Sequence, residues 1–376
     1  MFKISIRPQW LIQSEGADLR QALPRLLELL SLLHEDGNLA HACRSLDMSY
    51  RYAWGMIREG GELFGAPLVE TAKGQGTKLT TLGERLLWAE KRINARLAPV
   101  LDSLASELEV EIQQALNQSN EALRIHASHG FAVETMREFL LQRNIPVELK
   151  YRGSGEALAS LCKNTCELAG FHVPIGDLQE KALSQFMSWL KPNSQKLIHL
   201  ANRRQGIMVQ KGNPLGLLSM TDLFKPEVRF VNRQPGSGTR VLVDLLLEQE
   251  QLDGRRMEGY DTGEYTHAAV AAYIASGMAN AGFGVETAAR KFNLGFVPIV
   301  SERYFLICNA DTLASPPIKE LLAILRSKEF RAQVNELQGY DAAQSGQVMA
   351  LEDAFPEFAT LEKGPRRKAP RQGAVS

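Results

Sequence analysis

The chain has 376 residues, of which 44% are hydrophobic and 23% are charged, and its formal net charge is zero. This composition predicts two or three packed domains and excludes a chain that is disordered throughout; any contact with nucleic acid has to come from a local patch. The N-terminus lacks a secretory signal, and no stretch reaches the roughly 18 apolar residues of a membrane span. We therefore expect a soluble cytoplasmic protein with no membrane partner.

Residues 1–80 predict a DNA-binding domain. Leucines at helical spacing indicate a helix over 19–36, and Asn38 and Ser49 are placed to cap a second and a third helix. Residues 67–80 then have the pattern of two strands around a glycine-containing tip. Three helices followed by a hairpin is the order of a winged helix-turn-helix.

The third helix of such a domain enters the major groove of DNA. Its outward face and the hairpin tip supply the candidate DNA-binding residues, which are Ser49, Arg51, Tyr52, Arg58, Lys73 and Lys78. Arginine reads guanine or binds phosphate, and lysines at the tip would meet phosphate or the minor groove. A solvated helix face is the alternative, because Glu59 and Glu62 follow directly, but the order of the elements favours DNA.

Residues 81–118 predict a long linker helix. One apolar stripe runs along it at steps of three or four residues, formed by Leu97, Leu101, Leu104, Leu108, Ile112 and Leu116. Pro99 within the helix predicts a kink or a break. The stripe can pack on the chain's own next domain, but we favour the same helix of a second subunit. A homo-oligomer, a dimer or tetramer, would then bind double-stranded DNA at an inverted repeat.

Residues 119–355 predict a two-lobed α/β domain, because strand patterns alternate with helix patterns from residue 122 onward. We expect a mainly parallel sheet, with long strands at 196–211 and 295–308 as the two crossings between the lobes. The remaining residues, 356–376, form a basic tail that is rich in proline and glycine, and we expect it to be disordered.

Four strand-to-helix turns of this domain predict a site for a small anion. Ligands of open α/β sheets bind beyond the carboxyl ends of the strands, where helix N-termini offer N–H donors and partial positive charge. The candidate ligand-binding residues of these turns are Ser128, His129, Ser154, Ser237, Gly238, Thr239, Arg240 and Thr266. A single such turn is more often an ordinary helix cap, but four in one domain favour a ligand site. Arg240 either pairs with the anion or bridges to a neighbouring carboxylate.

The sequence offers little for catalysis or for binding a metal. It contains neither a Gly-x-Ser-x-Gly elbow nor a His-Glu-x-x-His motif, and its four cysteines lack the spacing of a zinc site. We therefore expect no enzyme, no catalytic residue, no metal and no cofactor besides an anionic effector. An enzyme that uses Ser237 as its nucleophile is the alternative, although no base for it is identifiable.

Two parts of the chain resemble known families. Residues 37–87 are similar to the winged helix of the molybdate-responsive ModE regulators and their LysR-type relatives, through Ser-Tyr-Arg-Tyr-Ala-Trp at 49–54 and Pro-Leu-Val-Glu at 67–70. Asp47 stands where such turns usually have glycine. Residues from about 122 to 350 resemble the periplasmic-binding-protein-like domain of one-component bacterial regulators, through the run at 232–240 and the stretch that begins at Thr266.

The resemblance implies a cytoplasmic transcription regulator whose two lobes close over a small anion. An oxyanion such as molybdate or tungstate is the expected effector. The alternative is formate or another small carboxylate, for which Arg240 would be the main anchor.

Overall fold

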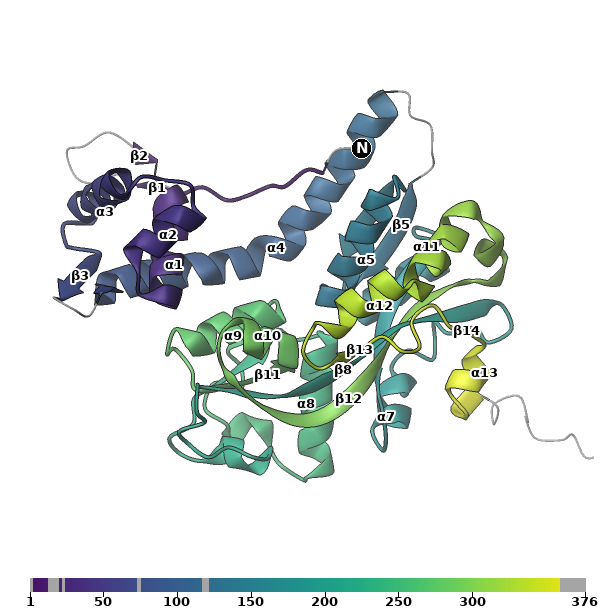
Figure 1. The fold of residues 1–376 in the computed structure, drawn as a ribbon. Coiled ribbons are helices and arrows are strands. Elements are labelled where there is room, and N and C mark those ends of the chain that lie inside the picture. Colours follow the sequence, from purple (N-terminus) through teal and green to yellow (C-terminus); the bar gives the residue numbers. More distant parts are fainter. Residues whose placement is uncertain (1–2, 13–19, 22–23, 73–75, 117–121, 359–376) are drawn as a thin grey trace, which may run out of the picture.

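The computed structural model describes residues 3–12, 20–21, 24–72, 76–116 and 122–358. Figure 1 shows a small N-terminal unit, a long helix that leads away from it, and a larger α/β domain. Lys73 lies outside the described residues, and so does the predicted disordered tail, except for its first residues up to 358.

The N-terminal unit has the predicted order of three helices and a hairpin. Its elements are β1 (Leu11–Ile12), β2 (Arg20–Gln21), α1 (Pro24–Asp36), α2 (Leu39–Ser45), α3 (Tyr50–Phe64), and the antiparallel strands β3 (Val69–Ala72) and β4 (Gly76–Leu79). Asn38 and Ser49 cap α2 and α3 as predicted, by accepting hydrogen bonds from the N–H groups of His41 and Tyr52. The first helix begins at Pro24 and not at residue 19, since proline suits the first turn of a helix.

The linker helix α4 (Thr81–Ala115) is capped by Thr80 and continues through Pro99. Figure 1 shows that it changes direction in its middle part. Its C-terminal half lies on the edge strand β6 (Val147–Tyr151), where Ser106 donates to the carbonyl of Val147 and accepts from the N–H of Leu149, each at 2.8 Å. The helix thus covers a strand edge whose backbone groups would otherwise be unpaired.

The predicted apolar stripe of α4 is displaced by part of a turn. Leu101 and Ile112 are half-buried, and the exposed row consists of Ile93, Leu97, Val100, Leu104 and Leu108. The buried side of the same half carries Ala105, Ser106, Glu109, Val110 and Gln113. The helix therefore uses one side for its own domain and leaves a second, apolar side free.

The larger domain contains one ten-stranded sheet whose two ends belong to different lobes. Lobe 1 contains β5 (Leu123–Ala127), β6 and β7 (Leu168–Pro174); lobe 2 contains β9 (Phe230–Arg233), β10 (Gly263–Glu264) and β11 (Ala281–Val285). The long strands β8 (Gln195–Val209) and β12 (Gly295–Asn309) run through both lobes, as predicted for the crossings. The sheet is parallel only within each lobe, because both crossing strands pair antiparallel with each other and with their neighbours. The prediction of a mainly parallel sheet was therefore wrong for the sheet as a whole.

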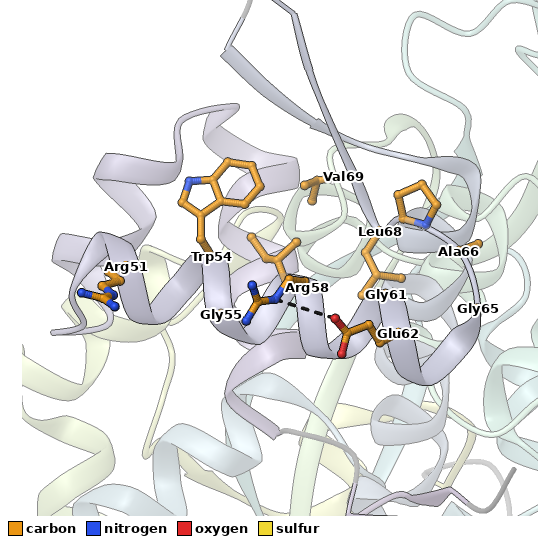
Figure 2. Close-up of a pocket in the computed structure, with 12 residues that line it drawn as sticks. Arg51, Trp54, Gly55, Arg58, Gly61, Glu62, Gly65, Ala66, Leu68 and Val69 are labelled. Atoms are coloured by element: carbon orange, nitrogen blue, oxygen red, sulfur yellow. Dashed lines mark ion pairs between the residues drawn. The ribbon is translucent and has the colours of Figure 1, made fainter.

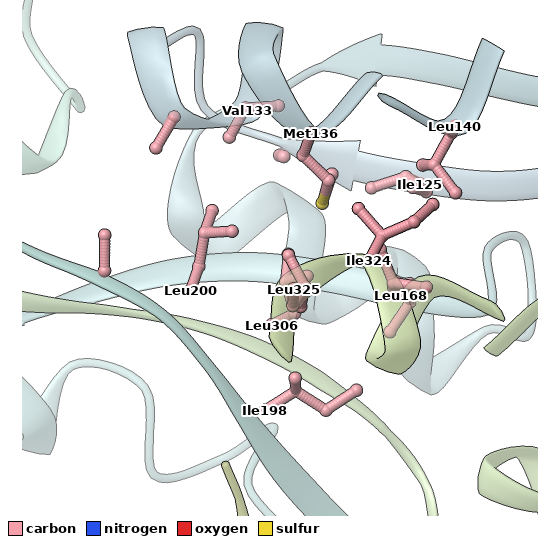
Figure 3. Close-up of a cluster of buried hydrophobic side chains, with 14 of the residues drawn as sticks. Ile125, Val133, Met136, Leu140, Leu168, Ile198, Leu200, Leu306, Ile324 and Leu325 are labelled. Atoms are coloured by element: carbon pink, nitrogen blue, oxygen red, sulfur yellow. The ribbon is translucent and has the colours of Figure 1, made fainter. Parts of the chain in front are cut away.

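Helices follow the strands on both lobes. They are α5 (Phe131–Gln142), α6 (Ser154–Cys162), α7 (Gln179–Ser184), α8 (Gly238–Gln249), α9 (His267–Ala275), α10 (Glu286–Lys291), α11 (Pro316–Arg326), α12 (Lys328–Asn335) and α13 (Leu351–Ala354); β13 (Tyr340–Asp341) and β14 (Val348–Met349) pair with β8. Figure 3 shows the core of lobe 1, in which Met136 and Leu140 of α5 face Ile324 and Leu325 of α11 above the sheet. In the described parts of the chain, no helix combines the length and the apolar character that crossing a bilayer requires.

Candidate functional site

A cavity of about 200 Å³ lies between the two lobes. Lobe 1 contributes Ser154 and His172, lobe 2 contributes Gly236 and Gly238, and Glu302 of the crossing strand β12 completes the polar part. The lobes are close together here: a Cβ atom added to Gly153 would lie 3.7 Å from the carbonyl oxygen of Gly236. We call this space the interlobe cavity. Of the four predicted strand-to-helix turns, those at 152–155 and 236–240 contribute lining residues.

Ser128 and Ser154 converge on one histidine of lobe 1. The Oγ of Ser128 lies 3.4 Å from Nε2 of His172, and the Oγ of Ser154 lies 3.5 Å from its Nδ1. Neither serine caps a helix, because the N-caps of α5 and α6 are Gly130 and Gly153. Neither hydroxyl is thus used for helix capping, and that they bind a ligand stays a prediction.

Ser237 and Thr266 have a different role. The hydroxyl of Ser237 accepts a hydrogen bond from the N–H of Arg240 at 3.1 Å and caps α8. The hydroxyl of Thr266 accepts from Ala269 at 2.9 Å and caps α9. These two turns follow the ordinary capping pattern. Of the α8 turn, Gly236 and Gly238 line the cavity, while Thr239 is buried in the helix.

Arg240 turns away from the interlobe cavity. Its guanidinium donates to Asp244 at 3.2 Å and to the carbonyl of Tyr260 at 3.0 Å, and it lies 3.8 Å from the centre of the Tyr260 ring. The sequence allowed two roles for Arg240, an anion contact or a bridge to a neighbouring carboxylate. The structure shows the bridge, which is formed with Asp244.

Arg233 is the arginine that the sequence analysis missed. It ends strand β9 and donates to the carbonyls of Glu264 and Tyr265, at 3.2 and 2.8 Å, but forms no ion pair with any residue that the structure describes. Burial, together with the positive charge of Arg203, lowers the pKa of Arg233 to about 9. It remains charged at neutral pH; the charge of Glu264 acts to raise its pKa, but that carboxylate is ion-paired with Arg96.

Three histidines surround this charge. Burial lowers the pKa of His129 to about 4, and it lowers the pKa of His172 and of His267 well below the usual value; the charge of Arg233 contributes in each case. His172 also stacks on Tyr304 with ring centres 4.0 Å apart. His129 is held at 3.1 Å from Glu134. The three rings are therefore neutral, because burial disfavours their charged form and the nearby positive charge adds to this effect.

The second arginine of the cleft is neutralised within the protein. Arg203 and Glu302 are register partners on the two crossing strands, both are buried, and they form an ion pair. Gln205 donates to the other oxygen of Glu302 at 2.8 Å. This pair balances the charge of Arg203 within the protein, whereas Arg233 forms no ion pair among the described residues.

The candidate DNA-binding residues lie on the exposed side of α3 and on the hairpin. Arg51, Tyr52 and Arg58 are exposed, and Arg51 and Arg58 line an open groove between α3 and the segment 65–69, which Figure 2 shows. Arg58 is 3.7 Å from Glu62, so part of its charge is paired. Lys78 is exposed on β4, and Ser49 serves as the cap of α3.

The sequence matches one known family over half of its length. Residues 137–326 match the family described as the PBP superfamily domain. The chain belongs to the PBP superfamily. The matched segment starts within α5 and ends with α11, so it contains both crossing strands and the strands of lobe 2, while β5 of lobe 1 lies before it.

Individual relatives are distant. The uncharacterized protein YvgK of Bacillus subtilis (strain 168) is 29% identical over 200 residues, which cover 53% of this chain and 64% of that protein. The molybdenum-pterin-binding protein MopB of Rhodobacter capsulatus is 23% identical over 188 residues, 49% of this chain and 68% of that protein. An ABC-type phosphate transport receptor from Vibrio cholerae is 17% identical, with a TM-score of 0.43, and the comparison covers 58% of this chain and 99% of that one.

We expect the neutral histidines of this PBP superfamily domain to make stability depend on pH. The pKa of His129 falls from 6.5 to about 4 on folding, so between these values the unfolded chain binds more protons and stability drops as pH falls. His172, with its pKa also lowered, acts in the same direction. Urea unfolding of His172→Gln between pH 7 and pH 4.5 should give a shallower pH slope, by up to about 1.4 kcal/mol per pH unit. The exposed histidine of α2, in His41→Gln, is the control; an unchanged slope for His172→Gln would contradict the prediction.

Proposed function

We propose that the protein is a DNA-binding regulator whose PBP superfamily domain binds a small anion. The observation that carries this proposal is Arg233, a charged group in the cleft with no ion pair among the described residues. The hydroxyls of Ser128 and Ser154 and the N-termini of α6 and α8 add further donors on the two sides of the same cleft. An anion bound there would pair with a charge that the folded protein otherwise keeps at a cost.

The effector we propose is an oxyanion such as molybdate or tungstate. A fully ionised dianion needs donors only, and Ser128, Ser154 and Arg233 supply them. The name of the relative MopB refers to molybdenum, which agrees with this class of ligand.

One observation favours the second candidate, a small carboxylate. The far wall of the interlobe cavity is apolar and is formed by Phe186, Trp189, Val241, Leu242 and Leu245. At about 200 Å³ the cavity exceeds the roughly 150 Å³ that accommodate a benzene ring in an engineered apolar cavity. A carboxylate with a compact apolar body would use both walls.

Binding, and not catalysis, is the role we propose for this cleft. A serine hydrolase needs a base whose second nitrogen is held by a carboxylate. Here both nitrogens of His172 face serine hydroxyls, at 3.4 and 3.5 Å. Ser237, the nucleophile of the alternative hypothesis, is occupied as the cap of α8.

DNA binding and dimerisation rest on the N-terminal unit and on α4. Arg51 and Tyr52 are exposed at the start of α3, where a recognition helix contacts base edges. The exposed row of α4 includes Val100 at 58% and Leu104 at 48% exposure, which is unusual for a regularly spaced apolar row on a helix. We propose that two copies of α4 pack along this row and that the dimer binds an inverted repeat.

The first test concerns the anion. Purified protein is screened by thermal shift against sodium molybdate, tungstate, sulfate, phosphate, formate and benzoate, and the affinity of each stabilising anion is then measured by calorimetry. Arg233→Met should weaken binding by about 10- to 100-fold, since a hydrogen bond to a charged group contributes about 1.5–3 kcal/mol. Arg229→Met is the matched control, because Arg229 is an exposed arginine just before the same strand. Wild-type affinity in Arg233→Met would place the anion elsewhere.

The second test concerns DNA. A binding sequence is first selected from fragmented genomic DNA with the wild-type protein. Arg51→Ala should then weaken binding to it by about 1–3 kcal/mol if the side chain reads a base, as measured by fluorescence anisotropy. Arg85→Ala, an exposed arginine on α4, is the control. Equal effects of Arg51→Ala on selected and on random DNA would mean that Arg51 contacts only phosphate.

The third test concerns the dimer. Leu104→Glu would bury an unpaired carboxylate in the proposed α4 interface and should raise the dimer dissociation constant at least about 100-fold. Thr81→Glu, at the exposed first residue of the same helix, adds the same charge outside the row and should leave it unchanged. Sedimentation velocity over a range of concentrations measures both. A Leu104→Glu protein that dimerises like the wild type would exclude this interface.

A further inference from the structure

The linker helix α4 is hydrogen-bonded to the two lobes at different positions along its length. On lobe 1, Ser103 accepts a hydrogen bond from the N–H of Tyr151 at 3.0 Å, one turn before Ser106 makes its two bonds to β6. On lobe 2, Arg96 donates to the carboxylate of Glu264 at 2.7 Å. Any change in the angle between the lobes therefore acts on α4 between residues 96 and 103.

Pro99 lies in the middle of this interval. In a regular α-helix the carbonyl of Ala95 would accept a hydrogen bond from the N–H of residue 99, but proline has no N–H. The hydroxyl of Thr266 donates to this carbonyl instead, at 2.9 Å. The proline therefore creates a free acceptor on the linker helix, and a residue of lobe 2 occupies it.

The same loop of lobe 2 also holds Arg233. The guanidinium donates to the backbone carbonyls of Glu264 and Tyr265, and the side chain of Glu264, which is completely buried, pairs with Arg96. Three consecutive residues, Glu264 to Thr266, thus connect the unpaired charge of the cleft to two consecutive residues of α4. The chain of contacts contains no gap, and its central members Glu264 and Thr266 are buried, whereas the side chain of Arg96 is half exposed.

We propose that the loop 264–266 and Pro99 form the coupling element of the protein, through which an anion at Arg233 changes the bend of the linker helix. This rests on the proposed anion-binding function and adds the route by which binding reaches the DNA-binding unit. A bound anion changes the strength of the hydrogen bonds between the guanidinium and the two carbonyls, either weakening or strengthening them. The loop 264–266 then shifts with the guanidinium. The helix yields at Pro99, because that is where its own hydrogen-bond ladder is interrupted. By linkage, anything that alters this bend also alters anion affinity.

The main test uses Pro99→Ala in the full-length protein. Alanine supplies the missing N–H and is the strongest helix former, so the variant is expected to fold. The carbonyl of Ala95 then has a partner within the helix and no longer depends on the hydroxyl of Thr266. Hydrogen exchange is followed by mass spectrometry with and without saturating sodium molybdate. In the wild type, molybdate should change exchange in both segments, 263–267 and 92–98, by at least about fivefold. In Pro99→Ala the change at 263–267 should persist and the change at 92–98 should disappear.

Pro316→Ala, at the start of α11, is the control and should behave like the wild type. A Pro99→Ala protein whose segment 92–98 responds to molybdate as in the wild type would overturn the proposal. So would a wild type in which molybdate protects 263–267 and leaves 92–98 unchanged.

A second hydrogen-exchange experiment uses no ligand, so it tests the coupling independently of the proposed anion binding. If molybdate does not stabilise the wild type at all, the proposed effector fails, and the coupling is judged on ligand-free protein. Arg233→Met should then speed exchange in 92–98 as well as in 263–267, because the loop loses two anchors, whereas Arg229→Met should change neither segment. Faster exchange that is confined to 263–267 would show that the loop does not communicate with α4.

Discussion

The guanidinium of Arg233 is the group on which the rest of the structure depends. It stands at the carboxyl end of a strand, in a cleft where helix N-termini already concentrate positive potential, and no described carboxylate pairs with it. Burial lowers the pKa of Arg233 to about 9, so the group keeps its charge at neutral pH. Such a group is costly to keep in a folded chain, and we propose that an anion from solution offsets the cost.

The surroundings of Arg233 are arranged so that this one charge stays uncompensated. Arg203 is neutralised by Glu302 where the two crossing strands pair, and His129, His172 and His267 are held neutral by burial. The crossing strands also join the lobes without a loop between them, so the cleft is bounded by continuous sheet. In the proposed site, Arg233 and Ser154 are held in position by the end of strand β9 and the start of helix α6.

The linker helix divides its surface between three tasks. Ser103 and Ser106 bind the edge of the sheet, the residues around Pro99 connect to lobe 2, and an exposed apolar row remains, along which we propose that a second copy of the chain packs. These tasks lie on different sides of one helix, so a small change of bend at Pro99 would alter the relation of the dimer row to the lobes. This is how we connect the proposed anion site with the N-terminal unit, for which we propose DNA binding.

The sequence by itself determined the features that depend on neighbours within a few residues. Asn38 and Ser49 cap their helices because the N–H groups they bind lie three residues away, and the strand-to-helix turns at Ser128 and Ser154 follow from local patterns of the same kind. Periodicity likewise located the linker helix and the crossing strands. These local signals fixed the order of the elements and two residues of the candidate site.

Only the tertiary structure decided which of the remaining polar groups share the cleft. Arg233, His172 and Glu302 belong to three different strands, and no spacing along the chain predicts that sheet pairing brings them together. Arg240, seven residues after Arg233, pairs with Asp244 instead. The hydroxyl of Thr266 donates to a carbonyl 171 residues away in the sequence, which lacks its helical partner because of Pro99. A side chain's partner depends on which groups the fold leaves unpaired, and that is settled only when the whole chain has packed.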